Sequence, residues 1–287
     1  MGFEAPRRLV RALGEDDDWL GRLPGIAEET VARLGLGVER VLAPGGRSSL
    51  IVLVRLADGT PATLKLPRRG PEPERAALER WDGWGSVRVL PVPEAGDALL
   101  LERLHPEVSL RSLPEAKALL EAAGVVRRLW VEPGDGHGFE SVAQRTERQA
   151  RALRGLDDPL VTAALDARDE LVSNASEDFL LHGSFRQGKV LAGDRAPWLA
   201  VGPEPLTGER AYDLARLVRD RAEDLVAASA GASAARRRVG RLADSLDVEP
   251  RRLRGWALFR AVESGMRAMA AGRVREAESS LEFASWL

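Results

Sequence analysis

The sequence predicts an α+β fold in two lobes, a small β-rich N-terminal lobe and a larger, mostly helical C-terminal lobe. Short apolar segments separated by turn residues fill the first hundred residues, and longer segments with helical spacing follow Pro106. One β-like hairpin at residues 179–205 interrupts the helical part. We therefore expect an N-lobe at residues 1–102 and a C-lobe at residues 103–287.

The N-lobe pattern predicts a β-meander with one helix, after helices at the N-terminus. A glycine-rich turn, Gly45 to Ser49, separates the first two strands, and glycine backbone can approach a ligand closely. The expected helix has Pro71 at its start and acidic residues in its first turn, as the helix dipole favours. The expected strands are 38–42, 50–56, 61–66, 87–90 and 98–101, and the helix is 71–81.

The C-lobe pattern predicts long helices around a small β-like island. Apolar residues recur there at the spacing of one buried helix face. The island begins at Phe179 and ends near Val201, and we expect two or three short strands that flank a loop. The expected helices are 114–129, 141–153, 160–173, 251–271 and 275–287, with a further helical stretch after Pro205.

The composition excludes several classes of function. Hydrophobic residues at 44% and charged residues at 30% are typical of a soluble globular protein, and no apolar run is long enough to span a membrane. The N-terminus has no secretory signal pattern, so we expect a cytoplasmic protein without membrane contact. There is no Cys and there are only three His, which argues against disulfides and structural metal sites. A net charge of -2 gives no case for nucleic-acid binding.

Lysine is rare in this chain, because only three of the 42 basic residues are Lys. One of them, Lys65, lies on the third expected strand, nine positions before Glu74 on the following helix. In kinases a Lys on the third strand contacts the nucleotide phosphates and pairs with a Glu on the adjoining helix. Lys65, Glu74 and the turn residues Ser48 and Ser49 are therefore candidate cofactor-binding residues, although a surface ion pair is the alternative interpretation.

The hairpin carries the most specific motif. His182-Gly183 is followed by Lys189-Val190-Leu191 and then by Pro197-Trp198-Leu199-Ala200-Val201. This resembles the streptomycin kinase and hydroxyurea phosphotransferase branch of the aminoglycoside phosphotransferases, which reads His-Gly-Asp-Leu-His-x-x-Asn-Val-Leu and then Pro-Trp-Leu-Ala-Ile-Asp-Pro-Lys. The resemblance covers nearly the whole chain and implies a bilobal protein-kinase-like fold. It also implies that Asp213, in Tyr212-Asp213-Leu214-Ala215, supports the loop.

Three positions depart from the family pattern. The family's catalytic Asp falls on Ser184, its metal-binding Asn on Lys189, and its second metal-binding Asp on Gly202. A hydroxyl cannot replace a carboxylate base, and a lysine ammonium repels a metal ion. We therefore expect a catalytically degenerate relative of these kinases, with no bound metal and no cofactor, since ATP and magnesium belong only to the kinase alternative.

The charge changes also suggest what this site binds. Arg186 and Lys189 add positive charge, so the leading hypothesis is a cationic cleft between the lobes for a small-molecule or anionic ligand, with a protein partner as a further expectation. Lys189 could instead pair with Glu204 and fill a dead site. A second alternative is an active small-molecule kinase. In a third, Lys189, Arg186, Glu204 and His182 catalyse a rearrangement, cyclisation or elimination in secondary metabolism.

Overall fold

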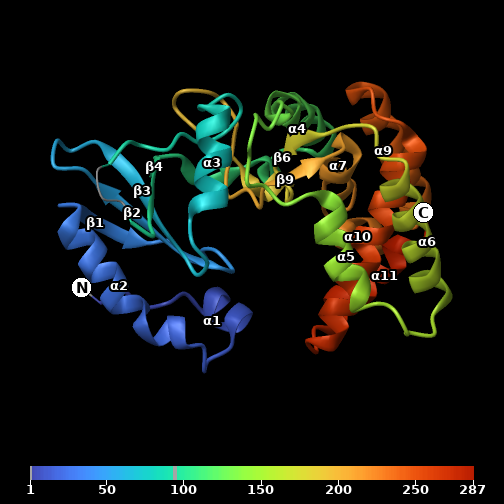
Figure 1. The fold of residues 1–287 in the computed structure, drawn as a ribbon, viewed down its shortest axis with the longest axis horizontal. Helices are drawn as coiled ribbons and strands as arrows, with labels where there is room; N and C mark the ends of the chain where they lie inside the picture. Colours follow the sequence, from blue (N-terminus) through green and yellow to red (C-terminus); the bar gives the residue numbers. More distant parts are fainter. Residues whose placement is uncertain (1, 93–95) are drawn as a thin grey trace. The chain divides into compact units, whose positions relative to one another are not determined.

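The computed structural model describes residues 2–92 and 96–287. The chain forms two compact units, Met1–Glu107 with Leu191–Leu199, and Val108–Val190 with Ala200–Leu287. The first unit is rich in strands and the second is mostly helical (Figure 1). The expected α+β class with a smaller sheet-containing part is thus confirmed.

The first unit is built on a four-stranded antiparallel sheet. Each strand pairs with the one before it in the chain, which gives the order β1-β2-β3-β4 (Figure 1). The register places Lys65 at the middle of the sheet, opposite Ile51 on one side and Leu99 on the other. The strands are β1 (Gly37–Val41), β2 (Ser49–Arg55), β3 (Pro61–Pro67) and β4 (Leu99–Glu102).

Two helices precede this sheet and one follows its third strand. The helix α2 (Asp18–Arg33) begins at Asp17, whose side chain accepts the Trp19 N–H, and α1 (Arg7–Leu13) lies before it. Buried leucines of α2 and of the sheet share one hydrophobic core. The helix α3 (Glu72–Trp81) has Glu72 and Glu74 in its first turn. A short connection joins β3 to α3, so Lys65 on β3 and Glu74 in the first turn of α3 are only nine positions apart in the sequence.

The expected strand at residues 87–90 does not form. Val89 makes only an isolated antiparallel bridge with Leu101. The N–H of the neighbouring Arg88 donates to the side-chain carboxylate of Glu102 at 2.8 Å, instead of to a backbone carbonyl of β4. Backbone bonds still flank the bridge, from the Leu90 N–H to the Leu100 carbonyl at 2.8 Å and from the Glu102 N–H to the Arg88 carbonyl at 3.0 Å. The Glu102 carboxylate takes the one reciprocal donor, so the pairing is limited to a single bridge. The strands expected at 38–42, 50–56 and 61–66 are confirmed to within two residues.

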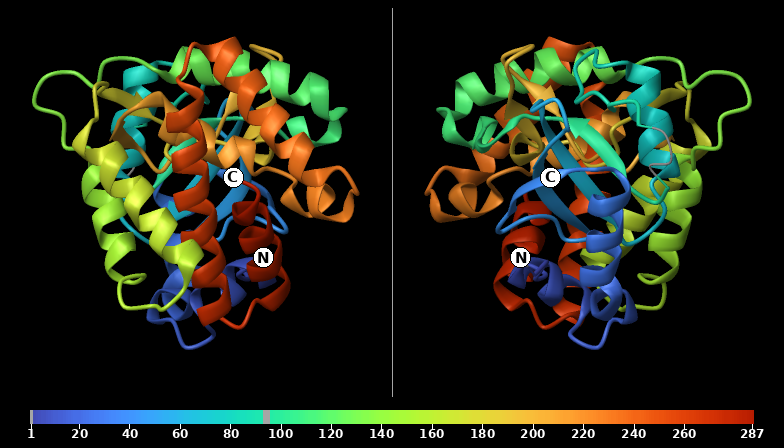
Figure 2. Two further views of the ribbon diagram at one scale, coloured as in Figure 1. Left: turned by 90° about the vertical axis from the view of Figure 1, so that its right-hand side faces the viewer. Right: turned by 90° about the vertical axis from the view of Figure 1, so that its left-hand side faces the viewer.

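The second unit is organised around α10 (Pro250–Ala270), which packs against α6, α7 and α11 (Figure 2). The short strands β6 (Phe179–Leu181) and β9 (Leu206–Gly208) pair antiparallel beside these helices. The remaining helices are α4 (Glu115–Leu129), α5 (Val142–Arg151), α6 (Pro159–Ser173), α7 (Arg210–Val218), α8 (Ala222–Ala227), α9 (Gly231–Leu246) and α11 (Val274–Ser285), with short 3-10 turns η1 (Leu110–Ser112) and η2 (Gln187–Lys189).

The strands β5 (His105–Ser109), β7 (Val190–Ala192) and β8 (Leu199–Ala200) contain the points at which the chain passes from one unit to the other. Within the described residues, no helix is both long enough and apolar enough to cross a membrane.

Candidate functional site

In the first unit, Lys65 and Glu74 form the ion pair that the sequence spacing predicts. The Lys65 ammonium donates to a carboxylate oxygen of Glu74. Their side chains are 12% and 11% exposed, so most of the pair is removed from water. A carboxylate in such a position fixes the direction of the ammonium, because a desolvated charge that loses its partner is strongly destabilised. The arrangement holds one compact positive charge at the middle of the sheet.

The two serines of the glycine-rich turn lie in the same unit as Lys65. Ser49 opens β2, is buried, and pairs with Pro67, two residues along β3 from Lys65. Ser48 is exposed, and its carbonyl accepts the Arg68 N–H at 2.9 Å. A Cβ on Gly46 would lie 2.9 Å from the Ser49 carbonyl oxygen, so a side chain at that position would collide with the turn. Contact of these serines with a nucleotide remains a prediction.

In the second unit, two buried side chains hold the backbone of the loop that follows β6. Asp213 of α7 accepts the N–H groups of His182 and Gly183, both at 2.9 Å, which confirms its expected supporting role. Burial raises the pKa of Asp213 to about 6, although both N–H groups and the Arg260 charge oppose the rise. Arg260 of α10 donates to the carbonyls of Gly183 (2.8 Å) and Tyr212 (3.0 Å). The local sequence pattern did not point to Arg260.

Gly183 is required by the close approach of two loop segments. Its φ is +73°, and a Cβ at this position would lie 2.0 Å from the Glu204 carbonyl oxygen. The Glu204 N–H in turn donates to the His182 carbonyl at 2.9 Å. A side chain at Gly183 would therefore push these segments apart.

His182 is fully buried beneath the loop. Its Nε2 lies 3.2 Å from the Val201 carbonyl oxygen, and its ring meets Phe185 edge-on, with 5.6 Å between ring centroids. Burial, and secondarily the positive charge of Lys189, hold the pKa of His182 well below its usual range. The ring is therefore neutral near pH 7, and its position is that of a residue that supports the loop.

Lys189 lies where three loop oxygens converge. Its ammonium donates to the Ser184 hydroxyl, to the Gly202 carbonyl at 2.7 Å and to a Glu204 carboxylate oxygen at 3.4 Å. Ser184 is fully buried, and the Lys189 side chain is 18% exposed. The structure thus brings together the three positions that depart from the family pattern, and the alternative Lys189–Glu204 ion pair is present.

Arginines surround the one carboxylate of this cluster. Partial withdrawal from water opposes ionisation of the half-exposed Glu204 side chain, but the charges of Lys189, Arg216 and Arg145 hold its pKa well below the usual range. Burial, together with the charges of Arg260 and Arg186, lowers the pKa of Arg216 to about 9. Glu204 is therefore ionised throughout the physiological range. Arg216 escaped the sequence interpretation because nothing in its local pattern marks it as a neighbour of the loop.

Arg186 lies half-buried at the start of the η2 turn, and its carbonyl accepts the Lys189 N–H at 2.9 Å. Asp220, which the sequence interpretation also missed, accepts the Gln187 N–H at 2.6 Å from beyond α7. These two contacts fix the peptide group that joins Arg186 to Gln187. They hold the loop in place without directing its side chain at a named reaction partner.

A kinase-like fold implies a bound nucleotide and a magnesium ion, and the residues of this chain fit the first but not the second. The Lys65–Glu74 pair fits a nucleotide phosphate, because kinases use this arrangement to contact phosphates. Magnesium needs oxygen ligands that usually include carboxylates. Around Lys189 the available oxygens already contact the ammonium, and no described residues gather three or more His, Asp or Glu into a metal-binding group. With the Lys189 ammonium on these oxygens, the loop residues do not fit a divalent metal ion.

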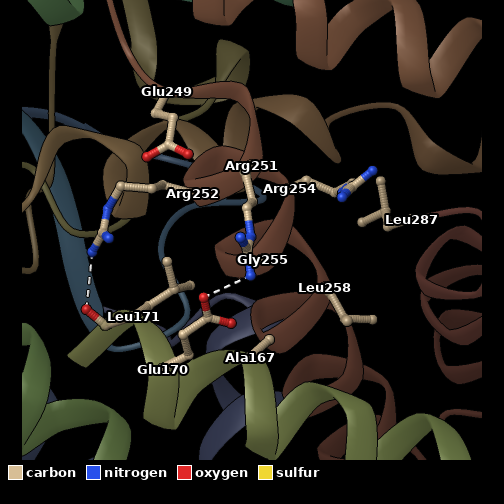
Figure 3. A pocket seen from close by; sticks show the side chains of 10 residues that line it. All are labelled: Ala167, Glu170, Leu171, Glu249, Arg251, Arg252, Arg254, Gly255, Leu258 and Leu287. Carbon is tan, nitrogen blue, oxygen red and sulfur yellow. Dashed lines mark hydrogen bonds and ion pairs between the residues drawn. The ribbon is translucent and has the colours of Figure 1, made fainter. Parts of the chain in front are cut away.

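A separate pocket of about 380 Å³ lies in the second unit, at the start of α10 beside α6 (Figure 3). Arg251 contacts Glu170 at 2.7 Å across it, and Arg252 donates to the Leu171 carbonyl at 2.9 Å. Arg252 also binds Glu209, which accepts the Trp256 indole N–H. None of the expected site residues lines this pocket, and its arginines mainly join helices.

The sequence matches the family described as aminoglycoside/hydroxyurea antibiotic resistance kinase over residues 35–272. It is 34% identical to a streptomycin 6-kinase of Streptomyces glaucescens, over 90% of this chain and 87% of that protein. It is 33% identical to a streptomycin 6-kinase of Streptomyces griseus, over 91% and 90%. A hydroxyurea phosphotransferase of Kitasatospora aureofaciens is 36% identical, over 67% of this chain and 59% of that protein.

Solved structures share the fold. Aminoglycoside phosphotransferase APH(4)-Ia has a TM-score of 0.64 at 17% identity, covering 91% of this chain and 96% of that one. A thermostable mutant of it, in a ternary complex with ADP and hygromycin B, has a TM-score of 0.61 at 17% identity, covering 91% and 97%. At this level of identity the likeness establishes the fold.

These relatives correct two expectations. The hypothesis of a catalytically degenerate protein without phosphoryl transfer is wrong, because relatives named as antibiotic kinases align over nine-tenths of the chain. The prediction of lost activity gave more weight to the changes at Ser184, Lys189 and Gly202 than to the family resemblance along nearly the whole sequence. The expectation that no cofactor is used is also wrong, because these relatives are kinases and a solved structure of this fold contains ADP.

The extent of the match, together with the retained Lys65–Glu74 pair and the Asp213-supported loop, leads to one assignment. This chain belongs to the aminoglycoside/hydroxyurea antibiotic resistance kinase family.

Proposed function

We propose that this protein is a small-molecule O-phosphotransferase that transfers the γ-phosphoryl group of ATP to a hydroxyl of an aminoglycoside-type antibiotic. The observation that carries the proposal is the alignment of two streptomycin 6-kinases over nine-tenths of the chain. In the reaction, the acceptor oxygen forms a bond to the γ-phosphorus while the bond to the leaving ADP oxygen breaks. The acceptor hydroxyl releases its proton to solvent water, so the products are the phosphate ester, ADP and one proton.

Lys65 supplies the nucleotide contact in this proposal, and Glu74 orients it. The pair is desolvated, so the ammonium is held in one direction before any ligand binds. Phosphoryl transfer passes through a loose transition state in most analyses, so positioning and charge stabilisation supply most of the catalysis. A strongly basic proton acceptor is therefore a smaller requirement than a fixed set of positive charges.

The loop of the second unit supplies the other fixed groups. Ser184, Lys189, Gly202 and Glu204 form one cluster, and Asp213 and Arg260 hold the backbone beneath it. We assign this cluster to the phosphoryl-transfer site because it follows the family motif His-Gly at the same place in the chain. His182 has a supporting role. Use of ATP agrees with the expected cytoplasmic location.

The test is a phosphorylation assay with purified protein, ATP and a panel that includes streptomycin, hygromycin B and hydroxyurea. Mass spectrometry should detect one added phosphoryl group on at least one hydroxylated compound, with a matching amount of ADP. The Lys65→Ala variant should lose this product, and Lys117→Ala, which changes an exposed lysine on α4, should retain it. No product with any member of the panel would contradict the proposal, and a product with hydroxyurea alone would reassign the acceptor.

A further inference from the structure

Lys189 has the surroundings of a bound cation. Its ammonium contacts a hydroxyl, a backbone carbonyl and a carboxylate, all of them oxygen ligands of the kinds that hard metal ions choose. The three oxygens come from Ser184, Gly202 and Glu204, so the cage is built from three separate places in the loop. The cation in this cage is part of the chain.

Lys189 occupies the motif position at which kinases have a metal-binding residue. In protein kinases the catalytic loop carries an Asp and, five positions later, an Asn that holds a magnesium ion. Lys189 follows Ser184 by the same five positions. An ammonium is a compact point charge, whereas an Asn side chain is neutral and needs the metal to bring positive charge. The chain thus places a fixed charge where kinases place a metal ligand.

We infer that the Lys189 ammonium takes the place of the loop-held divalent ion, so that this protein binds nucleotide phosphates with little dependence on magnesium. The inference rests on the proposed function, because it concerns how the same site receives the nucleotide.

Two features of the loop agree with a built-in cation. Gly202 has a φ of +62°, a conformation that favours glycine, and its backbone carbonyl accepts from the Lys189 ammonium at 2.7 Å. Because glycine has no side chain, this position offers a main-chain oxygen in place of a carboxylate. The Glu204 side chain is 55% exposed and makes the longest of the three contacts, at 3.4 Å. It can therefore move aside for an incoming phosphate, while the Ser184 and Gly202 contacts keep the ammonium in place.

The direct experiment is calorimetric titration of ADP into the wild-type protein, in excess magnesium and in excess EDTA. The two dissociation constants should agree within about threefold, since the charge that stabilises the phosphates stays with the chain. Affinity that is tenfold or more weaker in EDTA would overturn the inference. This comparison needs no variant, so it decides the question even where a substitution disturbs folding.

Substitutions of Lys189 test whether its charge is the source of the ADP affinity in EDTA. Lys189→Met removes the charge while keeping much of the side-chain length, and should weaken ADP binding in EDTA by about 10- to 100-fold, the range for a lost charged hydrogen bond. Magnesium should restore part of that affinity, because the three cage oxygens become available to it. Lys189→Arg should retain most of the binding in EDTA. Lys117→Met is the control and should match wild type; equal affinities of wild type and Lys189→Met in EDTA would count against the inference.

The outcomes separate this inference from the proposed function. Binding that strictly needs magnesium, together with phosphorylation of an antibiotic, would overturn the inference and leave the function in place. Magnesium-independent binding without any phosphorylated product would support the inference and contradict the function. No ADP binding in either condition would overturn both.

Discussion

The ion pair of the first unit and the loop of the second unit have kept different parts of the kinase arrangement. Lys65 and Glu74 retain both the side chains and their contact. The loop retains its backbone support, with Asp213 bound to two N–H groups, but carries Ser184, Lys189 and Gly202 where the family has two carboxylates and an amide. Loop geometry and loop chemistry have therefore changed separately in this chain, and the residues that shape the loop need different tests from those that fill it.

The largest expected effect comes from breaking the loop geometry with Gly183→Ala. The new Cβ meets the Glu204 carbonyl in a backbone conformation that favours glycine. Strain and overpacking of this kind together cost about 4 kcal/mol. Urea unfolding should report that loss of stability. The control is Gly188→Ala in the same loop, where the Cβ meets only Arg111 at an ordinary 3.5 Å, and it should change stability by less than about 1 kcal/mol.

The next effect is a pH dependence from Asp213, whose pKa burial raises to about 6. A carboxyl with a raised folded-state pKa favours the folded state when protonated. Its contribution is therefore complete below about pH 4 and is lost as the pH rises through about 6. A shift of about two pKa units corresponds to about 3 kcal/mol.

The measurement is the free energy of unfolding of wild type relative to Asp213→Asn across pH 4 to 7. The wild-type advantage should shrink as the pH rises. His182 acts in the opposite direction, because its lowered pKa removes stability as the pH falls, but it is present in both proteins and cancels in the difference. A wild-type advantage that grows with pH would contradict the assignment.

The third prediction tests the retained side chains of the first unit. Lys65→Ala removes the phosphate contact and leaves the Glu74 carboxylate without its ammonium. Affinity for ADP should fall about 100-fold, or about 2.7 kcal/mol, as expected when one partner of a desolvated charge pair is lost. Calorimetry gives this value, and a thermal melt separates it from unfolding. Unchanged ADP affinity would remove the nucleotide role of the pair.

The smallest effect concerns Arg260, which supports the loop from α10. Arg260→Met loses hydrogen bonds to the Gly183 and Tyr212 carbonyls and a stacking contact with the Tyr212 ring at 4.2 Å. We expect a loss of about 2 kcal/mol in unfolding free energy, since each of the two hydrogen bonds has a net contribution of about 1 kcal/mol. Arg267→Met, on an exposed part of the same helix, should cost less than about 0.5 kcal/mol.

The contacts that could be predicted from the sequence are those between residues close together in the chain or within a known motif. The Lys65–Glu74 pair joins a strand to the next helix, nine positions on, so spacing alone was enough to predict it. Asp213 was found through its motif. Arg260 reaches Gly183 across 77 positions, and no local pattern encodes a contact set by the packing of α10. The strand expected at 87–90 failed because alternation cannot foresee that the Glu102 side chain takes the Arg88 N–H.

The functional error had a different origin. Ser184, Lys189 and Gly202 were read one at a time, as the loss of a base and of two metal ligands. In the structure they form one cluster in which the lysine is held by the other two. A motif comparison counts such changes as losses, whereas the geometry shows that they are fitted to one another.

The most direct test of the proposed kinase activity is a single-turnover assay of antibiotic phosphorylation with the wild-type protein and its Lys65→Ala variant. Wild type should convert at least one hydroxylated antibiotic to a singly phosphorylated product with equal formation of ADP, and the variant should form far less. Equal, background-level product from both proteins would contradict it.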